Sequence, residues 1–298
     1  MSKDPAPGWR VTGISWGDGT ARLEWSGARG TERVSPLGLG TELSFVFGAE
    51  RKCIGFWRSG RRLECSTATV LAPGGRSPQC ADCHAMERSN SIATDTRLDD
   101  PRPFSVYLAH HGSVIKVGIT AAERGEARLL EQGALASTFI STGSLLGARR
   151  IENLLMTTLN LPDRVSTVRK RRARDQPGSA AERGASLIAI AEQVSELPWP
   201  DGQSRGEIQI RDHTAAYGLP ADGLRPDAGL QPVPGGVITG RIACAIGPDL
   251  YLETSAGLAL LDTHLLAGWA LGRAAAGAVL TVPLEKLEPP QREQDALF

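Results

Sequence analysis

Hydrophobic and polar positions change their period several times along the chain, and each change predicts a different kind of element. In residues 9–46, apolar and polar residues alternate in short runs, and the turn Gly17-Asp18-Gly19 joins two of them. This pattern is typical of antiparallel strands joined by hairpin turns. Residues 51–84 lack such a period and are rich in Gly, Ser, Arg and Pro. They have little hydrophobic core of their own and need another source of stability.

A second alternating stretch begins at Phe104 and predicts a hairpin followed by helices. The expected elements are strands at 104–109 and 114–120 joined by a turn at 110–113, a helix at 121–133, a third strand at 139–142 and a helix at 145–159. The first helix is predicted from its content of Ala, Glu, Leu and Arg, and it ends at a glycine. The second has apolar residues spaced so that one face packs on the sheet.

The pattern is less regular after residue 160. A helix is predicted at 179–197, a stretch rich in Pro, Gly and Asp follows at 199–235, and alternation returns at 236–287 with a short helix at 263–273. We therefore predict an α+β protein. The expected regions are a β-rich amino-terminal region at 1–50, a four-cysteine zinc-binding segment at 51–88, a central module with a basic extension at 103–197, a linker at 198–235 and a small β-rich carboxyl-terminal domain at 236–298.

Charge and hydropathy argue against a membrane-spanning protein, a secreted protein and a protein that is basic overall. The formal net charge is zero, so the chain as a whole is not attracted to nucleic acid or to a membrane surface, and any nucleic-acid contact must use a local patch. No apolar run approaches the roughly 18 residues that a bilayer span needs. The first residues lack the hydrophobic segment of a secretory signal. We expect a cytoplasmic protein with no membrane partner.

Four of the five cysteines lie close together in the sequence. They are Cys53, Cys65, Cys80 and Cys83, and the last two form a C-x-x-C pair. Such a pair places two thiolates on one tight turn, at about the separation that a tetrahedral Zn²⁺ requires. Four sulfur ligands would close the coordination shell, so the expected zinc is structural. Incidental buried thiols and a redox pair are the alternatives, and the spacing does not separate Zn²⁺ from Fe²⁺.

Several short runs carry a family resemblance. The runs are VYL at 106–108, KVGIT at 116–120, ARLLEQGA at 127–134 and RRIENLL at 149–155. Together with the preceding cysteines they resemble the GIY-YIG superfamily, and most closely a bacterial GIY-YIG-related family with a cysteine cluster, of the DUF2797 type. The resemblance covers residues 52–159, about a third of the chain. It implies a small α/β nuclease-like fold with Tyr107 at the first tyrosine position and Gly118 as the motif glycine.

The resemblance also implies a metal-dependent phosphodiesterase site. Tyr107 is the candidate base, assisted by Lys116, which stands where the excision-repair and homing nucleases have a second tyrosine. Arg128 is the candidate phosphate clamp, and Glu152 is the one carboxylate offered to Mg²⁺ or Mn²⁺. Each residue also has a plainer interpretation, as a strand aromatic, a surface charge or a partner in an ion pair along its own helix.

A basic segment follows the central module. Its side chains would contact phosphates without reading bases, although a run of charges is more often a solvated face. The expected nucleic-acid contacts are Arg124, Arg169, Lys170, Arg171 and Arg172. The leading hypothesis is therefore a nuclease acting on DNA or RNA. The alternatives are a catalytically inactive zinc-containing nucleic-acid-binding protein and an enzyme that reuses the cleft for a small molecule.

Overall fold

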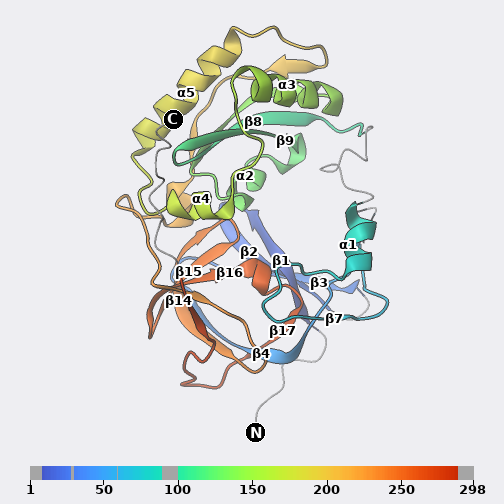
Figure 1. The fold of residues 1–298 in the computed structure, drawn as a ribbon, viewed down its shortest axis with the longest axis vertical. Coiled ribbons are helices and arrows are strands. Elements are labelled where there is room, and N and C mark those ends of the chain that lie inside the picture. Colours follow the sequence, from blue (N-terminus) through green and yellow to red (C-terminus); the bar gives the residue numbers. More distant parts are fainter. Residues whose placement is uncertain (1–8, 28–29, 59, 89–99, 288–298) are drawn as a thin grey trace, which may run out of the picture.

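The computed structural model describes residues 9–27, 30–58, 60–88 and 100–287, arranged as two stacked units (Figure 1). One unit contains a sheet with helices packed against it, and the other consists mainly of strands. The protein is therefore a mixed α+β structure with several sheets, as the sequence predicted. Of the helices in the described ranges, none is long and apolar enough to cross a membrane.

The helical unit is built on the predicted hairpin. Strands β8 (Phe104–His111) and β9 (Val114–Ala121) pair antiparallel, and β10 (Ala136–Gly143) pairs with the other edge of β8. The short strands β11 (Gln203–Arg205) and β12 (Arg211–Asp212) extend the sheet beyond β10. The central position of β8 means that its side chains are covered on both faces.

The two faces of this sheet meet different helices. One face packs against α3 (Leu145–Thr158) and α5 (Ala180–Ser195), forming an apolar cluster that includes Val106, Leu108, Ile151, Leu155 and Leu187. On the opposite face, Tyr107 and Ala109 pack with residues of and beyond α2 (Ala127–Glu131). Successive side chains of β8 therefore point in turn into the core under α3 and α5 and into a second, smaller cluster beside α2.

The helix predicted at 121–133 is broken. Residues Ala122–Arg124 form a 3₁₀ turn, η3, and α2 begins only at Ala127. Gly125 lies between them with φ = 43°, a left-handed value that a helix interior does not contain. The sequence did not predict this break, because most residues of the segment favour a helix and a summed propensity is little changed by one glycine.

The β-rich unit contains strands from both the early and the late part of the sequence. Strand β4 (Glu42–Lys52) lies between β14 (Val237–Ile246) and β17 (Trp269–Arg273) in one sheet. The remaining strands of that sheet are β7 (Val70–Leu71), β13 (Ala228–Leu230), β15 (Asp249–Thr254), β16 (Gly257–Asp262) and β18 (Leu284–Lys286). A separate three-stranded sheet contains β1 (Arg10–Gly17), β2 (Thr20–Ser26) and β3 (Glu32–Pro36).

Two further sequence expectations differ from the structure. The helix expected at 263–273 is only the 3₁₀ turn η4 (Thr263–Leu265), after which the chain becomes strand β17. Residues 198–235, expected to be a linker, contribute β11 and β12 to one unit and β13 to the other, together with the short helix α6 (Thr214–Tyr217). Strands of two or three residues are too short to produce a visible period. The last part of the expected carboxyl-terminal domain, 288–298, lies outside the described residues.

Candidate functional site

The four cysteines converge beside the end of β4. Cys53 directly follows that strand, Cys65 follows the hairpin of β5 (Phe56–Arg58) and β6 (Arg61–Leu63), and the C-x-x-C pair lies at the start of α1 (Ala81–Arg88). The four Sγ atoms all lie within 4.8 Å of one another. The Sγ atoms of Cys65 and Cys80 are 3.9 Å apart. Tetrahedral Zn²⁺ with Zn–S bonds of about 2.3 Å separates its sulfurs by about 3.8 Å. The cluster is thus compatible with a structural zinc site.

The surroundings of the four thiols differ, because burial raises the pKa of Cys53 and of Cys83 while hydrogen bonds favour the thiolate at Cys65. The backbone N–H groups of Cys80 and Gly55 donate to Cys53 Sγ at 3.2 and 3.4 Å. Burial opposes ionisation of Cys65, but hydrogen bonds from Thr67 and Thr69 outweigh it and lower the pKa of this thiol to about 5. Among the described residues between Cys53 and Cys83, no apolar side chain is fully buried. The segment lacks a core of its own, which is the situation in which a metal supplies folding free energy.

A second cluster surrounds Tyr107 on the face of the β8–β9 hairpin that α2 covers. The Tyr107 hydroxyl accepts a hydrogen bond from Gln132 Nε2 at 2.6 Å, and only 2% of the residue is exposed. Burial raises the pKa of this phenol, while the Gln132 hydrogen bond and the charge of Arg128 oppose that rise. Tyr107 lies directly opposite Gly118 on β9. A Cβ atom on Gly118 would stand 2.4 Å from the hydroxyl oxygen, so the tyrosine fits there because residue 118 has no side chain.

Lys116 lies on the same sheet face, two pairs further along the hairpin, opposite Ala109. Its Nζ stands 5.7 Å from the centre of the Tyr107 ring and donates to the Asp163 carbonyl oxygen at 2.8 Å. The residue is 8% exposed. Burial lowers the pKa of Lys116 to about 8, the charge of Arg128 adds to this effect, and the charge of Glu152 opposes it. Lys116 is therefore much closer to losing its proton at neutral pH than an ordinary lysine.

Arg128 and Glu152 complete the predicted set. Both side chains are half-buried, and both charges act on the Tyr107 phenol and on the Lys116 ammonium. Arg128 Nη1 is 3.6 Å from Glu131 Oε2, the carboxylate to which Arg124 also donates. Residues from β8, β9, α2 and α3 thus act on one another in a single cluster. Arg124, which was expected to contact nucleic acid, forms an ion pair with Glu131.

Three residues near this cluster were not among the predicted catalytic residues. Gln132 holds the Tyr107 hydroxyl, and its carbonyl oxygen accepts a hydrogen bond from Lys170 Nζ at 2.8 Å. His111 is 2% exposed, and neither of its ring nitrogens has a hydrogen-bond partner among the described residues. The strand period could have found His111, because Tyr107, Ala109 and His111 share one face of β8. Lys170 belongs to the predicted basic segment, but no local pattern points to its contact with Gln132.

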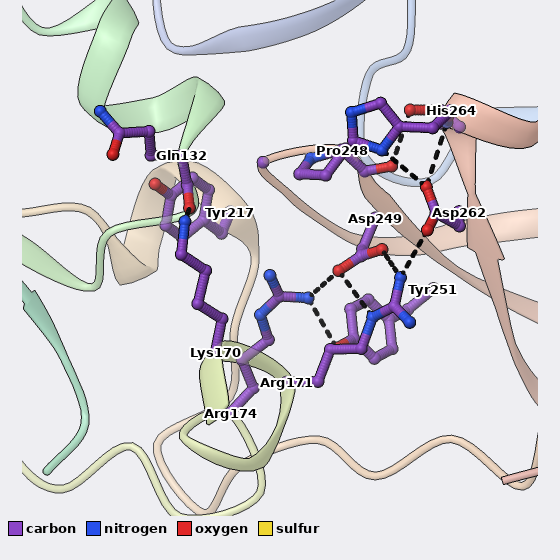
Figure 2. Close-up of polar contacts among 12 residues, drawn as sticks. Gln132, Lys170, Arg171, Arg174, Tyr217, Pro248, Asp249, Tyr251, Asp262 and His264 are labelled. Carbon is purple, nitrogen blue, oxygen red and sulfur yellow. Dashed lines mark hydrogen bonds and ion pairs between the residues drawn. The ribbon is translucent and has the colours of Figure 1, made fainter. Parts of the chain in front are cut away.

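The basic segment serves several different contacts, which Figure 2 shows in part. It forms α4 (Thr167–Arg172) and the residues after it. Arg171 binds Asp249 and Asp262 at 2.5 and 2.9 Å, and the buried Arg174 binds Asp249 at 2.6 Å. These pairs join α4 to β15 and β16 of the other unit. Arg171 was expected to contact phosphates, but these internal carboxylates already neutralise its charge.

Arg169 and Arg172 lie elsewhere on α4. They line a surface cavity of about 420 Å³ together with residues at the start of α5 and the β8–β9 turn. Four of the residues expected to contact nucleic acid therefore lie on one short helix, but their side chains point in different directions. Lys170 points toward Gln132, as Figure 2 shows, Arg171 toward Asp249, and Arg169 and Arg172 toward this cavity.

Comparison with known proteins gives one match. No curated protein and no solved structure matches the chain. The model of a family described as "Protein of unknown function (DUF2797)" matches residues 40–271. This range contains the four cysteines, the hairpin with Tyr107 and Lys116, and the ion pairs of Arg171 that join α4 to β15 and β16. Because the match extends over well more than half of its 298 residues, the chain belongs to the DUF2797 family.

Proposed function

We propose that the protein is a metal-dependent phosphodiesterase with a GIY-YIG-type site that acts on DNA or RNA. The observation that carries the proposal is the grouping of Tyr107, Lys116, Arg128 and Glu152, which act on one another electrostatically although they come from four different elements. Hydrolysis of a phosphodiester needs a base for water, a cation for the developing negative charge and help for the leaving oxygen. These four side chains offer a group for each need.

The proton-transfer role falls to Tyr107 and Lys116. Tyr107 accepts a hydrogen bond from Gln132, and this contact and the charge of Arg128 favour its ionised form against burial. Lys116 lies over the tyrosine ring, and its pKa of about 8 is close to the value that suits a group exchanging protons near neutral pH. In this arrangement Lys116 in its neutral form would accept the phenolic proton and become an ammonium, and the resulting phenolate would take a proton from the attacking water.

The remaining roles need a cation and a metal ligand. The half-buried guanidinium of Arg128 can form two parallel hydrogen bonds with a phosphate. The carboxylate of Glu152 would hold Mg²⁺ or Mn²⁺ together with water and substrate oxygens, which are the ligands such ions prefer. The ion would supply stabilisation of negative charge on the leaving oxygen. The zinc expected at the cysteines has four sulfur ligands and takes no part in this chemistry.

The arrangement of the elements also supports the proposal. A β-hairpin, a short helix, a third strand beside the first and a helix packed on the sheet follow one another in the order that the resemblance implies. Gly118 allows the close approach of Tyr107, which gives the motif glycine a physical role at this position.

A binding protein without catalysis is the second candidate, and one observation favours it. Tyr107 is only 2% exposed, and its burial raises its pKa. A phenol that stays protonated and covered would leave the cation cluster able to hold a phosphate but unable to activate water. This candidate shares every binding residue with the first, so only a measurement of cleavage separates the two.

The two candidates are separated by measuring binding and cleavage on the same samples. Labelled DNA and RNA would be incubated at low salt with Mg²⁺ or Mn²⁺, with anisotropy reporting binding and a denaturing gel reporting cleavage. Under the phosphodiesterase proposal, Glu152→Gln abolishes cleavage and retains binding. Arg150→Ala, an exposed change on the same helix, leaves both unchanged. Binding without cleavage by the wild type would support the second candidate, and the absence of both would reject the two together.

A further inference from the structure

Two lysine ammonium groups, one in the candidate site and one next to it, form no ion pair with a carboxylate among the described residues. Lys116 is 8% exposed, and its Nζ contacts the Asp163 carbonyl oxygen. Lys170 is half-buried, and its Nζ contacts the Gln132 carbonyl oxygen. In the part of the chain that the structure describes, neither forms an ion pair. Lysines are rarely buried unless paired, because removing a charge from water is costly.

The surroundings of Lys170 are dominated by positive charge. Burial, together with the charges of Lys116, Arg174 and Arg128, lowers the pKa of Lys170 to about 8, and the charge of Asp249 opposes this shift. Asp249 is already bound by two arginines, Arg171 and Arg174. The fold thus holds more positive than negative charge around Lys170, which is the condition under which a bound anion relieves repulsion.

His111 gives an independent indication of a ligand. It lies on the same face of β8 as Tyr107, two residues beyond Ala109, and both of its ring nitrogens are buried without a hydrogen-bond partner among the described residues. It also lies close enough to Lys170 and Lys116 for their charges to lower its pKa further, after burial. A buried polar group without a partner is uncommon and indicates a missing ligand or water. A neutral imidazole can donate one hydrogen bond to an oxyanion.

We propose that Lys170, Lys116 and His111 form an oxyanion pocket that receives a phosphate group of the substrate. Each ammonium has three N–H donors and uses one on a backbone carbonyl, so the two lysines offer four further hydrogen bonds. Lys170 reaches the pocket from α4, outside residues 52–159 on which the resemblance to the nuclease superfamily rests. The inference deepens the proposed function by assigning a phosphate-binding residue to it, although binding of phosphate does not itself require cleavage.

The test is calorimetric titration of inorganic phosphate into the full zinc-loaded chain at pH 7 and constant ionic strength. Lys170→Met keeps most of the length of the side chain and removes its charge, and it is expected to weaken phosphate binding at least tenfold. Lys170→Arg keeps the charge and is expected to retain a substantial part of the affinity. Lys286→Met, at an exposed position of β18, is the matched control and should bind like the wild type.

Each outcome decides the inference. Because Lys170 carries unpaired charge, Lys170→Met should also unfold at the same or a higher temperature than the wild type, so lost binding cannot be attributed to lost folding. Equal phosphate binding by wild type and Lys170→Met, or no binding by the wild type at millimolar phosphate, would overturn the proposal. If cleavage is never observed but Lys170→Met loses phosphate binding, the pocket stands and the phosphodiesterase proposal fails. If cleavage occurs, Lys170→Met should raise KM for an oligonucleotide more than it lowers kcat.

Discussion

The replacement of Gly118 by alanine tests how closely the hairpin is fitted around Tyr107. The new Cβ would stand 2.4 Å from the tyrosine hydroxyl oxygen, 2.5 Å from Cζ and 3.0 Å from Cε2. The ring cannot easily move away. It is 2% exposed, its hydroxyl is held by Gln132 at 2.6 Å, and it packs edge-on against Phe139 with ring centres 6.4 Å apart. We therefore expect Gly118→Ala to displace the tyrosine and destabilise the fold.

The expected magnitude follows from three contributions. Inserting a methyl group into a packed site costs about 1–3 kcal/mol, because neighbouring side chains leave their preferred positions. Loss of the hydrogen bond between Gln132 and Tyr107 adds about 1 kcal/mol. Gly118 is not among the glycines with positive φ, so alanine should recover up to about 1 kcal/mol by restricting the unfolded chain. We expect a net loss of roughly 1–3 kcal/mol in the free energy of unfolding.

Urea denaturation measures this loss, and two further variants show its cause. Gly13→Ala is a matched strand control, because the nearest atom to its new Cβ would be 3.7 Å away. It should change stability little. Tyr107→Leu removes the ring, so adding Gly118→Ala to that variant should cost little more. An equal cost of Gly118→Ala with and without the tyrosine ring, measured as a double-mutant cycle, would refute the reasoning.

Three other predictions follow from the charges and thiols. Wild-type protein should contain one zinc per chain by mass spectrometry of metals, and Cys83→Ser should contain none and be cleaved by trypsin within residues 51–88. Asp249→Asn leaves Arg174 buried without its carboxylate and should cost about 3–5 kcal/mol in urea denaturation. The pKa of Lys170 is about 8 instead of 10.5, so between these values the unfolded chain binds a proton that the folded chain has released. Stability should therefore rise with pH across this window in the wild type, and the rise should be smaller in Lys170→Met.

The sequence predicted those elements whose signal is local. The hairpin of β8 and β9 was expected at 104–109 and 114–120, because both strands show sustained alternation around a glycine-containing turn. The convergence of the cysteines was expected because four thiols in a segment without a core of its own are typical of a metal site. The contact between Gln132 and Tyr107 was not foreseen.

The missed features depend on partners that are distant in the sequence. The sequence of a basic segment does not show whether its arginines face solvent or bind buried carboxylates. Arg171 binds Asp249, which is 78 residues away in the sequence. The same limit applies to Lys170, which reaches Gln132 across 38 residues. Residues 198–235 were expected to be a linker because strands of two or three residues carry no period. Tertiary contacts decide all three cases, and none leaves a local pattern.

The most direct test of the proposed phosphodiesterase site is the dependence of cleavage on Mn²⁺ concentration in zinc-loaded protein. Cleavage of a mixed DNA and RNA panel should saturate with Mn²⁺ in the wild type. Glu152→Gln should lose that cleavage at every Mn²⁺ concentration while its urea denaturation midpoint stays close to that of the wild type. Cleavage that persists in Glu152→Gln, or no cleavage by folded wild-type protein at any Mn²⁺ concentration, would contradict the account.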